Sequence, residues 1–80
     1  MYLRNKSKIV NLQLATCISV EEASFLGNPN HDLLRIKFNS GEVVFDLPRG
    51  KGKEFLRKLE ELISKNSHLI YGVEEICSTL

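Results

Sequence analysis

The chain has 80 residues, of which 42% are hydrophobic and 26% are charged. This length suits one small domain, and the composition excludes a disordered, collagen-like or transmembrane chain. Eleven basic and ten acidic residues give a formal net charge of +1, so the whole chain carries no strong field for a polyanionic partner. We expect a single domain over residues 1–80.

Strand patterns dominate the first third of the chain. The polar turn Asn5-Lys6-Ser7 separates two short β-prone runs and predicts a hairpin. Residues 16–22 alternate between apolar and polar, as a half-buried strand does. Gly, Asn, Pro and Asp are concentrated in residues 27–32, which predicts an exposed loop where Asp32 forms an Asx turn or caps an element.

The clearest pattern is a hairpin over residues 33–47, in which apolar and charged residues alternate on both sides of Asn39-Ser40-Gly41. Its charged faces predict cross-strand pairs between Arg35 or Lys37 and Glu42 or Asp46. From Lys51 the apolar period changes from two to 3.6, which predicts a helix over residues 51–65 that packs on the sheet. The expected core consists of Leu34, Ile36, Phe38, Val43, Phe45, Leu56, Leu59 and Leu62.

Residues 69–80 carry a second apolar stripe at helical spacing. We expect a short helix from Val73 onward, while Ile70 and Tyr71 also suit a short edge strand. The stripe is a candidate interface with a second copy of the chain, and the alternative is a tail that folds back onto its own core. The stripe consists of Leu69, Val73, Ile76, Cys77 and Leu80.

Together these elements predict the α+β class. We expect an antiparallel β-meander of four or five strands in residues 1–47, followed by the main helix over 51–65 and a short C-terminal helical element over 69–80. Parallel pairs are not expected, because they need a helical crossover and none precedes Lys51.

The strand-to-helix junction is the most suggestive local feature, because residues 49–58 hold five basic side chains and one acidic one. Its two glycines could leave backbone N–H groups open at a helix N-terminus, where a phosphate is favoured. The spacing does not match a nucleotide-binding P-loop, and a flexible turn with solvated lysines is the competing interpretation. The candidate anion site consists of Arg49, Gly50, Lys51, Gly52 and Lys53.

Other chemistry has little support in the sequence. Cys17, Cys77, His31 and His68 form no local metal-binding pair, so we expect two packed cysteines, no metal and no cofactor. The neighbours His31 and Asp32 are not a catalytic triad, since a triad has to meet in space. The residues thus favour a non-enzymatic protein.

Location and function are expectations of the same kind. No run of residues approaches the roughly 20 apolar positions needed to cross a bilayer, and isolated cysteines suit a reducing cytoplasm. The sequence favours a small module that binds another protein or itself, most simply as a homodimer. The alternative is a nucleic-acid or phosphorylated-ligand binder that uses the basic turn at residues 49–53, although exposed stacking aromatics are not evident.

Overall fold

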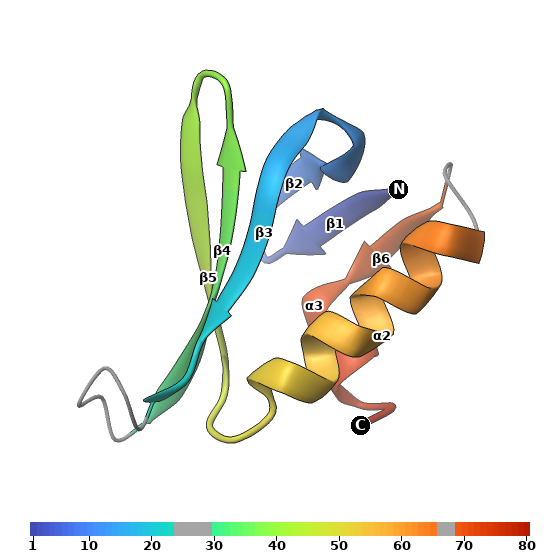
Figure 1. Cartoon of the computed structure of the whole chain (residues 1–80). Coiled ribbons are helices and arrows are strands. Elements are labelled where there is room, and N and C mark those ends of the chain that lie inside the picture. Colours follow the sequence, from blue (N-terminus) through green and yellow to red (C-terminus); the bar gives the residue numbers. More distant parts are fainter. Residues whose placement is uncertain (24–29, 66–68) are drawn as a thin grey trace.

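The computed structural model describes residues 1–23, 30–65 and 69–80. Figure 1 shows a first hairpin, a three-stranded meander, a long helix and a short return to the first hairpin. The elements are β1 (Tyr2–Asn5), β2 (Lys8–Asn11), η1 (Leu12–Leu14), β3 (Ala15–Glu21), β4 (His31–Phe38), β5 (Gly41–Pro48), α2 (Gly52–Lys65), β6 (Ile70–Gly72) and α3 (Val73–Cys77). The expected loop at residues 27–32 lies partly outside the described residues, at 27–29.

The described strands form two sheets of three. Sheet A has the order β2-β1-β6, and sheet B has the order β3-β4-β5 and is antiparallel throughout. The α+β class is confirmed, with a meander in sheet B. The expectation of no parallel pair is wrong, because β6 runs parallel to β1. The chain reaches β6 through α2, which supplies the crossover that a parallel pair requires.

A short 3-10 turn separates the two sheets. The side chain of Asn11 accepts a hydrogen bond of 3.0 Å from the Gln13 N–H and caps η1. Leu12 donates its N–H to the Met1 carbonyl at 3.0 Å, which ties this turn to the start of the chain. The turn thereby separates β2 in sheet A from β3 in sheet B.

One core lies between the sheets and the helices, since α2 packs against β3 and β4, and α3 packs against α2, β1 and β6. Of the expected core, Leu34, Ile36, Phe45 and Leu59 are buried, and Phe38, Val43 and Leu62 are partly buried against them. Leu56 is only half-buried and lines a shallow apolar groove. The other large buried side chains are Met1, Leu3, Val10, Leu12, Leu47, Phe55, Val73 and Ile76.

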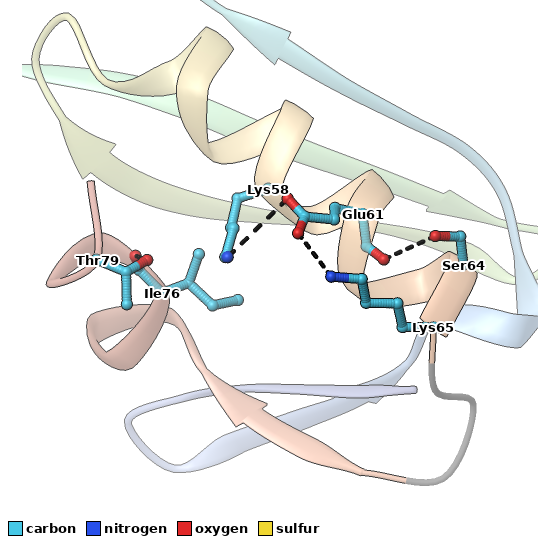
Figure 2. A network of polar contacts seen from close by, with 6 residues as sticks. All are labelled: Lys58, Glu61, Ser64, Lys65, Ile76 and Thr79. Carbon is cyan, nitrogen blue, oxygen red and sulfur yellow. Dashed lines mark hydrogen bonds and ion pairs between the residues drawn. The ribbon is translucent and has the colours of Figure 1, made fainter.

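The solvent side of α2 carries charged pairs between successive turns of the helix. The carboxylate of Glu61 lies 2.9 Å from Lys65 Nζ and 4.0 Å from Lys58 Nζ (Figure 2). The Ser64 hydroxyl donates a hydrogen bond to the Glu61 carbonyl (Figure 2). Beside this helix, Thr79 donates to the Ile76 carbonyl at 2.7 Å and closes the end of α3 (Figure 2). Exposed pairs of this kind contribute little to stability, so the helix depends on its buried face.

On the outer face of sheet B, Arg35 joins all three strands. Its guanidinium donates to Glu21 at 2.8 Å and to Glu42, so one of the predicted cross-strand charge pairs is present. Lys37 lies opposite Glu42 in the register, and Asp46 lies opposite Leu33. Hydrogen bonding and the charges of the two carboxylates raise the pKa of Arg35, which stays positive at every accessible pH.

Among the helices in the described part of the chain, none is long and apolar enough to span a bilayer.

The opposite faces of β5 give a direct test of the core. Phe45 is 4% exposed and its neighbour Val44 is 41% exposed. We expect Phe45→Ala to lower the free energy of unfolding by about 3–5 kcal/mol, because it leaves a cavity in the core. Val44→Ala is the control and should stay within about 0.5 kcal/mol. Urea denaturation measures both, and equal midpoints for the two variants would contradict the assignment of the faces.

Candidate functional site

The basic turn connects β5 to α2 and is folded tightly. Gly50 adopts a φ of +79°, which glycine reaches without strain. Lys51 donates its N–H to the Pro48 carbonyl at 3.1 Å, and its own carbonyl accepts the first helical bond, from Phe55, at 2.9 Å. The turn therefore delivers the chain from the end of sheet B directly into the first turn of α2.

The carboxylate of Asp32 lies at the centre of this junction. Its Oδ1 accepts hydrogen bonds from the N–H of Ala23 at 2.9 Å and of Gly50 at 3.2 Å, and its Oδ2 accepts from the N–H of Gly52 at 2.8 Å. Asp32 is 1% exposed, and it is the one charged side chain that is buried within residues 1–23, 30–65 and 69–80. It belongs to β4 rather than to an exposed loop, so that expectation is wrong.

The surroundings of Asp32 keep it ionised. Burial is the largest influence on its pKa and acts to raise it. Hydrogen bonds from Ala23, Gly52 and Gly50, together with the positive charge of Arg49, outweigh burial and lower the pKa below its ordinary value. The carboxylate also lies at the N-terminus of α2, where the helix dipole favours a negative charge.

Gly52 lies so close to this carboxylate that no side chain fits at its position. A Cβ atom at this position would overlap Val20 Cγ1 and would lie 2.7 Å from Asp32 Oδ2. At Gly50 nothing lies within 4 Å of such an atom, so its requirement is conformational only. The two glycines therefore serve a close packing contact and a positive φ, respectively.

The candidate anion site at residues 49–53 is thus assembled as one turn, but the N–H groups of its two glycines are not open. The N–H groups of Gly50 and Gly52 both bind Asp32. Lys53 Nζ lies 3.2 Å from Glu22 Oε1, and Lys51 Nζ lies 3.7 Å from Glu54 Oε2. An anion from solution would therefore compete with acidic neighbours at Lys51 and Lys53.

The residues of the tail stripe fall into a buried group and an exposed one. Val73 and Ile76 are 4% and 2% exposed, and both belong to the core of their own chain, as the alternative of a folded-back tail predicts. Cys77 and Leu80 pack partly against the same core, while Leu69 remains 47% exposed. Both the short strand and the short helix expected in this segment are present, as β6 and α3.

The remaining candidate ligands form no metal site among the described residues. Cys17 is exposed rather than packed, His31 is on the surface at the start of β4, and His68 is outside the described residues. No cluster of three metal-ligating side chains occurs in the part of the chain that the structure describes. Burial, and to a lesser degree the charge of Glu74, raises the pKa of the Cys77 thiol, which makes it a poor nucleophile.

A hollow of about 450 Å³ lies alongside the second half of β5. Its apolar floor includes Phe45, Leu47 and Val73, and Asp46 and Glu74 bring negative charge to it. The sequence patterns predicted neither this hollow nor the burial of Asp32, although the expected capping role of Asp32 is present at the first residue of α2. One signal for Asp32 was present, because it lies two and four residues before the inward Leu34 and Ile36.

Comparison with protein-family models, curated proteins and solved structures finds no match.

The Asp32 junction gives a test with a defined pH dependence. Asp32→Asn keeps the shape of the side chain but replaces one carboxylate oxygen by an NH₂ group, which cannot accept a hydrogen bond. At least one of the three N–H donors therefore loses its acceptor. We expect a loss of about 1–3 kcal/mol in the free energy of unfolding at neutral pH. The native pKa of Asp32 is below its unfolded value, so its contribution is present above the unfolded pKa and is lost as pH falls through the native pKa.

The difference between wild-type and Asp32→Asn stabilities should therefore shrink as the solution is acidified below the ordinary Asp range. Urea titrations at a series of pH values measure this difference and cancel the contribution of other carboxylates. A difference that stays constant down to the acid limit would show that the Asp32 charge does not stabilise the fold.

Proposed function

We propose that this chain is a non-enzymatic interaction module that associates with a second copy of itself through the outer face of sheet A. The observation that carries the proposal is a group of three exposed apolar side chains on adjacent strands. Ile70 is 55% exposed, Ile9 is 54% exposed and Tyr2 is 38% exposed. We refer to these three residues as the sheet A patch.

The register places the patch on one face. Tyr2 pairs with Ile70, and Arg4 pairs with Ile9, and residues that face each other across two strands point to the same side of a sheet. Tyr2 and Arg4 are two positions apart on β1, so they also share that side. The opposite side carries Leu3, which is fully buried, so the patch faces solvent.

Contiguous exposed apolar side chains mark interaction surfaces more often than single ones do. A two-fold dimer would bury six such side chains, two copies each of Tyr2, Ile9 and Ile70. So small an apolar area supports a weak, reversible dimer rather than a permanent one.

The charges at the rim of the patch suit a second copy. Arg4 lies on the same face as the patch and 3.5 Å from Glu75, and both side chains are more than half exposed. A two-fold arrangement allows Arg4 of one copy to approach Glu75 of the other. A face with one charge of each sign is neutral and does not repel its own copy.

Two further parts of the proposal rest on simpler support. The absence of catalysis is inferred from Asp32, whose carboxylate is already occupied by three backbone donors. A cytoplasmic location agrees with the free thiols of Cys17 and Cys77, which persist in a reducing compartment.

Sedimentation tests the dimer. We expect the wild type to self-associate with a Kd between about 10 μM and 1 mM, the range of a weak dimer. The double variant Ile9→Ser/Ile70→Ser should weaken association at least about tenfold without unfolding the chain. Val44→Ser is the matched control, because Val44 is similarly exposed on the outer face of sheet B. A wild type that remains monomeric at about 1 mM would rule the dimer out.

The second candidate function is binding of nucleic acid or a phosphorylated ligand through Arg49, Lys51 and Lys53. The clustering of these cations in one turn supports it, and their acidic neighbours weaken it. Under this proposal, single-stranded RNA binds the wild type and the affinity falls steeply with salt. The variant Arg49→Ser/Lys51→Ser/Lys53→Ser should lose that binding. Fluorescence anisotropy with labelled RNA at near-physiological salt measures it, and no binding by the wild type removes this candidate.

A further inference from the structure

The edges of the two sheets differ in how far they are protected against an added strand. At the edges of sheet A, β2 has four residues and β6 has three. At one edge of sheet B, β3 shifts register between Ala15 and Cys17. Short strands and bulges both limit pairing at an edge. β5 has neither protection, because its eight residues pair with β4 in an unbroken register.

The outer edge of β5 offers both backbone partners and space. In an antiparallel edge strand, alternate residues direct their N–H and C=O groups away from the neighbouring strand. The hollow of about 450 Å³ follows this edge from Val44 to Pro48. Its opposite wall comes from the β1–β2 turn, at Asn5 and Lys6, and from α3, at Val73 and Cys77. Side chains of an added strand therefore have room on the core side.

The charge of this edge selects its occupant. Glu42, Val44 and Asp46 alternate along the outer face of β5. Glu42 binds Arg35, whereas Asp46 forms no ion pair with any residue that the structure describes. Within the hollow, Asp46 and Glu74 outnumber Lys6, so the local charge is negative.

A second copy of β5 fits this edge poorly. An antiparallel pairing centred on Val44 would place Glu42 of each copy opposite Asp46 of the other, and like charges that face each other destabilise a sheet. A basic strand would instead place its cations beside Asp46.

We propose that β5 binds an extended peptide segment of another protein in which lysine or arginine alternates with apolar residues. The segment adds a fourth strand to sheet B. Its basic side chains lie on the outer face near Asp46, and its apolar side chains enter the hollow above Phe45 and Val73. Main-chain hydrogen bonds supply affinity and the alternation supplies specificity, as in other complexes formed by strand addition.

Two capped eight-residue peptides test the charge selection. One alternates lysine with valine, and the other alternates glutamate with valine. In fluorescence anisotropy with the full chain, the lysine peptide should bind with a Kd below about 1 mM, and its affinity should fall as salt rises. The glutamate peptide should bind at least about tenfold more weakly. No saturable binding of the lysine peptide, or equal binding of both peptides, would overturn the proposal.

Variants of the chain test the location. Asp46→Lys turns an attraction into a repulsion and should weaken binding of the lysine peptide about tenfold, and Asp46→Asn should have a smaller effect. Glu60→Lys is the matched control, since it makes the same charge change at an exposed position on α2. Circular dichroism checks that each variant is folded, and Asp46→Asn keeps the test valid if Asp46→Lys is not. Equal weakening by Glu60→Lys would place the peptide elsewhere.

Methylated peptides test the pairing itself. Backbone N-methylation at alternate residues removes every second N–H from the lysine peptide, in either of two patterns. Strand addition predicts that only the pattern that methylates the N–H groups facing β5 abolishes binding. Binding of both methylated peptides would show that no strand is added. The Ile9→Ser/Ile70→Ser variant should bind the lysine peptide normally, and a loss there would assign the peptide to the sheet A patch instead.

Discussion

The buried carboxylate of Asp32 fixes the place where sheet B meets α2. Two of its three donors belong to Gly50 and Gly52, about twenty positions along the chain, and the third belongs to Ala23 at the end of β3. A buried charge is tolerated only when hydrogen bonds replace its hydration. Because these bonds hold the first turn of α2, they also determine where Phe55 and Leu59 enter the core.

The same interaction changes what the basic turn can do. A helix N-terminus preceded by glycines and lysines is typical of an anion site, but here the anion is supplied by the chain itself. The lysines then lie beside Glu22 and Glu54. The negative charges of Asp32, Glu22 and Glu54 offset the helix dipole, which alone disfavours cations at a helix N-terminus. Function is therefore better sought on the sheets, where apolar and acidic groups are left exposed.

Local periodicity predicted the parts of the fold that local interactions decide. The hairpin at Asn39-Ser40-Gly41 and the stripe of α2 follow from alternation by two and by 3.6. The division into two sheets and the parallel pairing of Tyr2 with Ile70 depend on contacts between distant segments, which no local pattern encodes. Asp32 illustrates both kinds of information. Its spacing of two from Leu34 indicates an inward position on a strand, but two of its hydrogen-bond donors are about twenty residues away. The composition of residues 27–32 alone therefore indicated a loop.

The proposed surfaces differ in chemistry and do not share their apolar residues. None of Tyr2, Ile9 and Ile70 lines the hollow beside β5, and the acidic edge at Asp46 is unlike the neutral rim formed by Arg4 and Glu75. The proposed dimer therefore uses none of the apolar residues of the proposed peptide site. If both proposals hold, a dimer presents two strand-binding edges on one particle, which raises the effective concentration for a partner with repeated basic segments. Weak association at each surface is then compatible with strong binding of a multivalent partner.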